Sequence, residues 1–174
     1  IYGFSNEDKK NATSKAREDI VNISKTINFC ILQKEITPQK NNSKFGRLLF
    51  DMRSLMEWRK FIITNKFCYG DIVCIQYPMI NYPFGFSFVL KLLRKKRIKT
   101  IAIIHDLNCV RYPQFQLFRK KEIITLNSFD CLINHNNKMN IKLTEFGIDR
   151  PKIVDLQIFD YLSSCADKRS SKCN

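Results

Sequence analysis

Residues Gly70–Arg111 read GDIVCIQYPMINYPFGFSFVLKLLRKKRIKTIAIIHDLNCVR, and this stretch decides the fold. Two short, largely β-branched runs, Ile72–Ile75 and Ile101–Ile104, are typical of buried strands and too short for helices. Between them, Phe84–Arg97 has the apolar spacing of an amphipathic helix. A helical crossover between two continuous apolar strands predicts a right-handed βαβ unit with parallel strands.

The helix predicted over 84–97 has an apolar face and a basic end. Phe84, Phe88 and Leu92 recur at steps of four, with Val89 and Leu93 beside them, so we expect this face to pack against the sheet. The basic residues lie towards the other side or the end of the helix: Lys91, Arg94, Lys95, Lys96 and Arg97.

The rest of the chain alternates between helix and strand in the same way. We expect helices at 14–27 (with Ser14 as the N-cap), 45–67, 116–127 and 138–146, and strands at 29–32, 129–133 and 153–158. The helix at 45–67 is expected to be broken near its middle, and Gly147 to stop the one at 138–146. The inward residues predicted for 116–127 are Leu117, Ile123, Ile124 and Leu126. This alternation predicts a three-layer α/β fold with a Rossmann-like parallel sheet.

Composition restricts the class of protein. The chain has 174 residues, 44% of them apolar, which is enough to bury the core of one domain. The 7 Cys residues form no CxxC pair and the 2 His residues lie far from any Cys pair with zinc-site spacing, so we expect reduced thiols in a cytoplasmic protein and no metal site. No apolar run approaches the ~18 residues that a membrane span requires, and the first residues lack the layout of a signal peptide.

The formal net charge of +14 admits several partners. A basic surface suits nucleic acid, anionic lipid or an anionic small substrate, and charge alone does not choose among them. A solvated basic face in a compositionally biased chain is the simplest explanation. Nucleic-acid binding is disfavoured because the sequence contains no helix-turn-helix, RRM-type aromatic signature or zinc finger.

Polar residues follow two of the predicted strands at the edge where parallel sheets bind ligands. His105 and Asp106 come directly after the strand over 101–104. His105 is a candidate general base, and Asp106 a candidate for orienting it or accepting a proton. The structural explanation is that Asp106 caps the next segment and His105 bonds to backbone groups. Arg111 either pairs with Asp106, binds an anionic acceptor, or is an ordinary surface arginine.

A second polar cluster, Asn134-His135-Asn136, follows the strand over 129–133 and is expected at the same edge. Planar polar groups beside aromatic rings bind sugars, and Tyr77 is the candidate ring, although a tyrosine before proline equally often packs in a core. The sequence contains no GxGxxG after a strand, no Walker lysine loop and no GxSxG elbow.

The ordered motifs resemble the N-terminal half of bacterial galactofuranosyltransferases and the related glucosyltransferases that extend protein or polysaccharide glycans. The matching segments are IYGFS (1–5), KARED (15–19), GDIVCIQYP (70–78), IIHDLNCVR (103–111), CLINHNNKM (131–139), Gly147 and LQIFDYL (156–162). The resemblance implies a GT-B enzyme that transfers a hexosyl or galactofuranosyl unit from a sugar nucleotide to a glycan hydroxyl without a metal. It also implies that His105 and Asp106 belong to the acceptor cleft. Gly3 and Ser5 match the family's first loop near the donor phosphates, where a loop glycine and a solvated serine are the plain alternative.

This resemblance carries expectations about the extent of the chain. We expect an acceptor-side domain over 1–162 that lacks its first strand, and a polar, disordered tail over 163–174. The nucleotide sugar would bind mainly to a missing C-terminal domain, so the chain alone should not transfer sugar. The alternative is a non-catalytic carbohydrate- or partner-binding module, or a degraded remnant.

The resemblance also suggests partners. The family's acceptors are glycans that are often carried on lipids at the inner face of the cell membrane. We therefore expect electrostatic, salt-sensitive attachment to an anionic membrane through Lys95, Lys96 and Arg97, with the apolar face of the same helix kept in the core. A second basic group, Arg119, Lys120 and Lys121, opens the helix that follows. A homo-oligomer stays open as an alternative association.

Overall fold

The computed structural model describes residues 12–32, 43–79 and 85–156. In chain order the elements are α1 (Ala12–Thr26), α2 (Lys44–Thr64), β1 (Ile72–Tyr77), α3 (Phe86–Lys95), β2 (Lys99–Ile104), α4 (Asn108–Arg111), the 3₁₀ helix η1 (Pro113–Phe118), α5 (Arg119–Asn127), β3 (Cys131–Asn134), α6 (Asn137–Glu145), the 3₁₀ helix η2 (Arg150–Lys152) and β4 (Ile153–Asp155). Within these residues no helix is long and apolar enough to cross a lipid bilayer.

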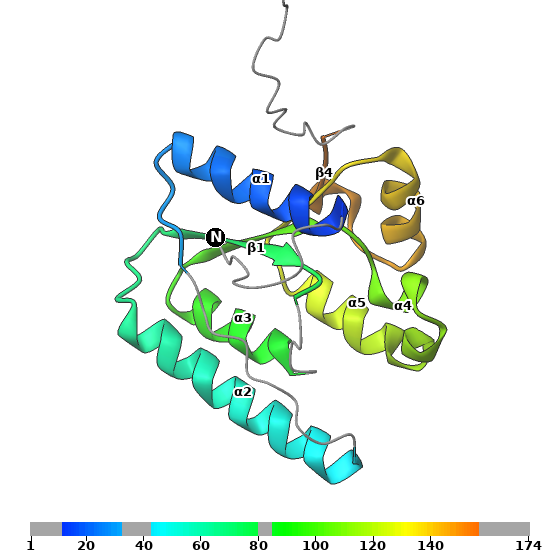
Figure 1. Ribbon diagram of the computed structural model, residues 1–174, viewed down its shortest axis with the longest axis horizontal. Helices are drawn as coiled ribbons and strands as arrows, with labels where there is room; N and C mark the ends of the chain where they lie inside the picture. The colour runs from blue at the N-terminus through cyan, green and yellow to red at the C-terminus, as the bar shows by residue number, and fades with distance from the viewer. Residues whose placement is uncertain (1–11, 33–42, 80–84, 157–174) are drawn as a thin grey trace, which may run out of the picture.

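The described strands form one sheet in the order β1-β2-β3-β4, and every neighbouring pair is parallel. Helix α1 lies on one side of β1, while α3 and α2 lie on the other (Figure 1). Alternate side chains of β1 confirm the two layers, since Gln76 bonds to α1 and Tyr77 bonds to α5. The predicted three-layer α/β arrangement with a Rossmann-like parallel sheet is confirmed.

The βαβ unit predicted from the central stretch is present, but α3 buries a different face. Its buried residues are Phe86, Val89, Leu90 and Leu93. Phe88 is 51% exposed, so the face predicted from Phe84, Phe88 and Leu92 is wrong for Phe88, and Phe84 lies outside the described residues. The reason is the contact with α2: the rings of Trp58 and Phe86 meet edge to face with centroids 5.0 Å apart, which fixes the rotation of the helix.

Helix α2 is a single element, so the predicted break is wrong. It begins at a side-chain cap, where the Ser43 hydroxyl accepts a hydrogen bond from Gly46 N at 2.9 Å. Trp58 and Ile62 lie in the core.

The segment after β2 differs from the single helix predicted over 116–127. It begins as the 3₁₀ helix η1, and this change of helix type leaves Leu117 90% exposed. Ile124 is also exposed, whereas Leu126 is buried and Ile123 packs against the core. Two of the four predicted inward residues therefore point to solvent.

Several predicted boundaries are also corrected. Helix α1 begins at Ala12, so Ser14 lies within the helix and is not its cap. Of the strand predicted at 29–32, only Leu32 forms a bridge. Helix α6 is followed by Gly147 with φ +81°, as predicted for a residue that stops a helix. Strand β4 ends at Asp155, and residues 157 and 158 of the predicted strand lie outside the described part.

Candidate functional site

The carboxyl ends of β1, β2 and β3 bring the strand-end polar residues to one edge. The backbone continues the sheet here, since His105 N donates to Tyr77 O at 2.8 Å. His135 follows β3 in the same way, and its Nδ1 lies 3.3 Å from Ile104 O. His105 and His135 are thus placed side by side at the predicted edge, both partly exposed.

A chain of hydrogen bonds connects His105 to α1. Nε2 of His105 lies 2.8 Å from Oε1 of Gln76, and Nε2 of Gln76 donates to Arg17 O at 3.1 Å. Because the amide nitrogen of Gln76 is used by Arg17 O, its oxygen faces the imidazole, so His105 donates through Nε2–H. The basic lone pair of neutral His105 is therefore on Nδ1.

The surroundings keep the imidazole of His105 neutral. Burial, the positive charge of Arg17 and the neighbouring His135 together lower the pKa of His105 from 6.5 to about 3. The guanidinium of Arg17 is fixed at this edge, where Nη2 donates to Pro78 O at 2.6 Å. At neutral pH the imidazole of His105 is thus uncharged.

Asp106 and Arg111 form an ion pair beside this edge, with 3.4 Å between Oδ2 and Nη1. The other carboxylate oxygen of Asp106 accepts from Leu107 N at 2.8 Å. Asp106 therefore makes the pairing with Arg111 considered from the sequence, but it does not cap the next segment, because the N-cap of α4 is Leu107 and has no side-chain cap hydrogen bond. Both side chains keep part of their surface open to solvent.

The Asn134-His135-Asn136 cluster does not act as one surface. Asn134 is fully buried, donating to Oδ1 of Asn140 at 2.9 Å and accepting from Asn136 N. Asn136 caps α6, because its Oδ1 accepts from Met139 N at 2.7 Å. These two side chains organise the loop, and His135 is the member of the cluster that turns towards His105.

Tyr77 is corrected from a sugar-facing ring to a core residue. Its side chain is fully buried, and its hydroxyl donates to Glu122 Oε1 at 2.8 Å. The cause is strand alternation: Tyr77 points to the layer of α3 and α5, opposite to Gln76. Gly3 and Ser5, the remaining predicted residues, lie outside the described part of the chain.

Glu122 is a buried carboxylate that the sequence analysis missed. Only 3% of its surface is exposed, and it also accepts from Asn108 N at 2.9 Å and Cys109 N at 2.8 Å. The signal that would have found it is its helical position, four residues before the buried Leu126 and so on the inner face of α5. Arg17 and Gln76 were likewise not singled out, because their contacts join residues 59 positions apart.

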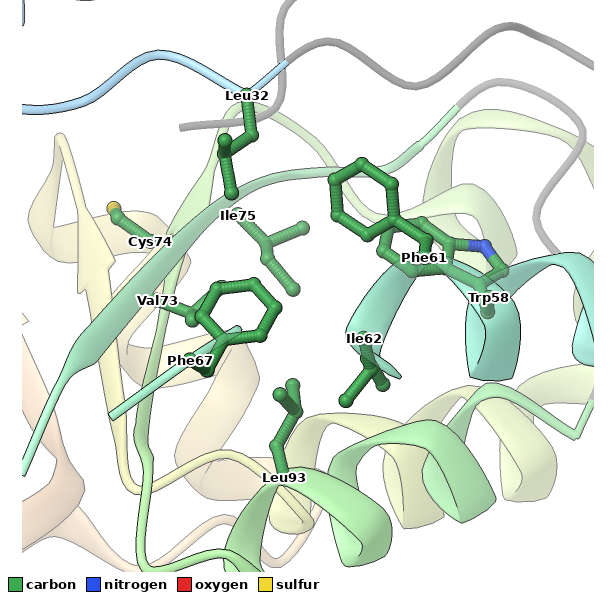
Figure 2. A pocket seen from close by; sticks show the side chains of 9 residues that line it. All are labelled: Leu32, Trp58, Phe61, Ile62, Phe67, Val73, Cys74, Ile75 and Leu93. Atoms are coloured by element: carbon green, nitrogen blue, oxygen red, sulfur yellow. The ribbon is translucent and has the colours of Figure 1, made fainter. Parts of the chain in front are cut away.

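An apolar cavity of about 30 Å³ lies between β1, α2 and α3, away from this edge (Figure 2). Its lining residues are Leu32, Trp58, Phe61, Ile62, Phe67, Val73, Cys74, Ile75 and Leu93. Figure 2 shows the side chain of Cys74 directed away from the others, as expected from its neighbours on the strand. Ligand pockets are about tenfold larger or more, so this space is a packing gap in the core.

The family comparison agrees with the motifs at this edge. Residues 1–158 match the family described as glucosyltransferase 3-like, N-terminal domain. No curated protein matches the sequence. Because the match covers most of the chain, including every described element, the chain belongs to the glucosyltransferase 3-like N-terminal domain family.

Proposed function

We propose that this domain supplies the acceptor side of a GT-B glycosyltransferase. In this proposal a hexosyl or galactofuranosyl unit passes from a sugar nucleotide to a glycan hydroxyl, and a second domain holds most of the nucleotide. Membership of a glucosyltransferase-related family supports the reaction class. The neutral His105 at the carboxyl edge of the sheet is the observation that carries the proposal.

In this proposal the imidazole of His105 receives the proton of the acceptor hydroxyl. The hydroxyl oxygen attacks the anomeric carbon, a new C–O bond forms, and the bond from that carbon to the phosphate oxygen breaks. The phosphate leaves with the bonding electrons, and the hydroxyl proton passes to His105. A pKa of about 3 makes the imidazole a weak base before substrates bind. Since the charge of Arg17 contributes to that low pKa, donor phosphates placed near Arg17 would strengthen the base.

Asp106 and Arg111 are proposed to bind the acceptor beside His105. Their ion pair is partly exposed, so a sugar hydroxyl can reach either partner. His135 extends the same polar edge. A domain that only binds carbohydrate would use the same residues for affinity, but it would not require His105 as a proton acceptor.

The test has two stages. The chain contains only 2 His residues, so the imidazole NMR signals are readily assigned with a His135→Gln variant. An oligosaccharide acceptor should shift the His105 signals, and a sugar nucleotide alone should have a much smaller effect. Binding of sugar nucleotide without any response to oligosaccharide contradicts the assignment to the acceptor side.

The second stage measures turnover in a two-domain enzyme that carries this domain. His105→Gln and Asp106→Asn should each lower kcat roughly 10²-fold or more while the domain stays folded. Asp149→Asn makes the same change at a more exposed carboxylate and serves as the charge-matched control. Full activity in both site variants refutes their catalytic role, and losses confined to KM favour a binding module.

A further inference from the structure

The outer face of α2 carries a row of exposed apolar side chains, here called the α2 stripe. Its members are Phe45, Leu48, Leu49, Met52, Met56 and Ile63. Most of their positions differ by three, four or seven residues, so they share one face of the helix. Met56 is the most exposed member, at 71%. Exposed methionine, leucine and phenylalanine in one contiguous row indicate an interaction surface.

The inner face of the same helix is already packed against the core. Phe50, Ser54, Trp58 and Ile62 recur at steps of four and are buried. Trp58 and Ile62 line the apolar cavity that α2 shares with β1 and α3, and α2 lies on the outer side of α3 in Figure 1. A helix that is apolar on both faces normally has both covered. In the described part of the chain, the α2 stripe is open to solvent.

The charges around the stripe are predominantly positive. The two acidic residues of α2 are each paired with an arginine one turn earlier, Arg47–Asp51 at 3.3 Å and Arg53–Glu57 at 3.0 Å. Two further cations, Arg59 and Lys60, are exposed near the end of the helix. Arg59 follows Met56 by three positions and precedes Ile63 by four, so it lies within the stripe itself.

The basic end of α3 extends this positive region. The guanidinium of Arg97 lies 5.6 Å from the ring centroid of Tyr69, which joins the end of α3 to the segment that follows α2. Lys95 and Lys96 are exposed beside it, and Lys66 is exposed just after α2. The basic ends of both helices thus belong to one region.

We propose that the α2 stripe lies on an anionic membrane surface. Helices with a lipid-facing apolar row and flanking Lys and Arg lie in the plane of the interface, and this geometry requires no segment that spans the bilayer. The long side chains of Arg59 and Lys60 can keep their charges among the lipid headgroups while their methylene groups contact apolar surface. The inference goes beyond the proposed transfer reaction and does not depend on it.

Charge selects this partner over a second copy of the chain. Two copies that met through α2 would bring their own cationic ends together, and each chain carries a formal net charge of +14. An anionic bilayer offers both the apolar layer and the opposite charge. The stripe therefore adds apolar contact to the purely electrostatic attachment expected from the sequence.

The test is sedimentation of the full chain with vesicles of phosphatidylcholine, with and without phosphatidylglycerol. Met52→Gln/Met56→Gln removes apolar surface from the stripe without changing charge. Leu117→Gln is the control, because Leu117 is an apolar residue on η1 that is even more exposed, at 90%, than Met52 or Met56. Fluorescence of the only tryptophan, Trp58, which is buried on the inner face of α2, verifies that each variant is folded.

We expect binding to the anionic vesicles, little binding to phosphatidylcholine alone, and partition reduced roughly tenfold or more in the double variant. The Leu117→Gln variant should bind like the parent chain. Equal binding by the double variant and the parent overturns the proposal. It is also overturned if no binding occurs at low salt. A third contradicting result is a dimer that does not bind vesicles and that dissociates when Met52 and Met56 are replaced.

Discussion

Replacing Glu122 with glutamine should destabilise the domain without changing its shape. The carboxylate is buried and accepts three hydrogen bonds, from the Tyr77 hydroxyl and from the backbone N–H groups of Asn108 and Cys109. It thereby fastens β1 and the start of α4 to α5. Glutamine is nearly isosteric, but its amide group has an oxygen on one side and an NH₂ donor on the other.

The magnitude follows from the three bonds. Oε1 receives two of them, so a glutamine oxygen placed there keeps both contacts but loses the negative charge, at a cost of about 1 kcal/mol each. The NH₂ group then faces Cys109 N–H, and this unmatched donor costs a further 1–3 kcal/mol or so. A neutral side chain is also easier to bury, which offsets part of the loss. We expect a net loss of about 3 kcal/mol.

Urea unfolding followed by Trp58 fluorescence measures the change, because this single tryptophan is buried in the core. The midpoint should fall while the slope with denaturant stays constant. Glu145→Gln is the control, since Glu145 is an exposed partner of Lys142 and should change stability by no more than about 0.5 kcal/mol. If Glu122→Gln were as stable as the parent chain, the described network would not contribute as argued.

Three further predictions concern single groups. The pKa of His105 is about 3 in the folded chain and near 6.5 in the unfolded chain. Between these pH values the unfolded state binds more protons, so the free energy of unfolding should fall as the pH drops from 6.5 towards 3. After allowance for partial exposure the loss is on the order of 1–3 kcal/mol, and a pH series on His105→Gln that keeps the parent's slope would contradict it. Gly147→Ala places a side chain at φ +81° with no atom in its way, so thermal unfolding should show a loss of roughly 1–2 kcal/mol, and Gly147→Asn a smaller one. Burial and the Glu122 carboxylate raise the pKa of Cys109 to about 12. Mass-spectrometric mapping after brief alkylation should therefore find Cys109 unmodified and the exposed Cys68 modified. Equal labelling of the two thiols in the folded chain would refute this.

The central unit could be predicted because continuous apolar runs, typical of buried strands, stand on both sides of a segment with helical apolar spacing. The runs around Val73 and Ile103 are apolar without alternation, which is what a strand covered on both faces requires. The rotation of α3 could not be predicted, because the stripe through Phe88 and the stripe through Phe86 are both apolar. Only the position of Trp58 on α2 decides between them.

The candidate site was partly predictable for a similar reason. The position of His105 follows from the end of a strand, so the sequence was sufficient to place it at the edge. Its low pKa depends on burial and on the charge of Arg17, and its tautomer depends on Gln76. Arg17 and Gln76 lie 59 positions apart, and no local pattern links them. Tyr77 was misplaced because consecutive residues at the end of β1 are all buried, so the sequence does not reveal which layer each side chain enters.

The bond between Gln76 and α1 makes the polarity of the edge depend on a helix. While Arg17 O occupies the Gln76 amide nitrogen, the imidazole of His105 presents a lone pair at Nδ1. A shift of α1 that withdrew this carbonyl would allow the amide to rotate and offer its NH₂ group to His105 Nε2. The imidazole would then carry its proton on Nδ1, and the same position would become a donor. The identity of the group that meets a ligand at this edge is thus set by the placement of the first described helix.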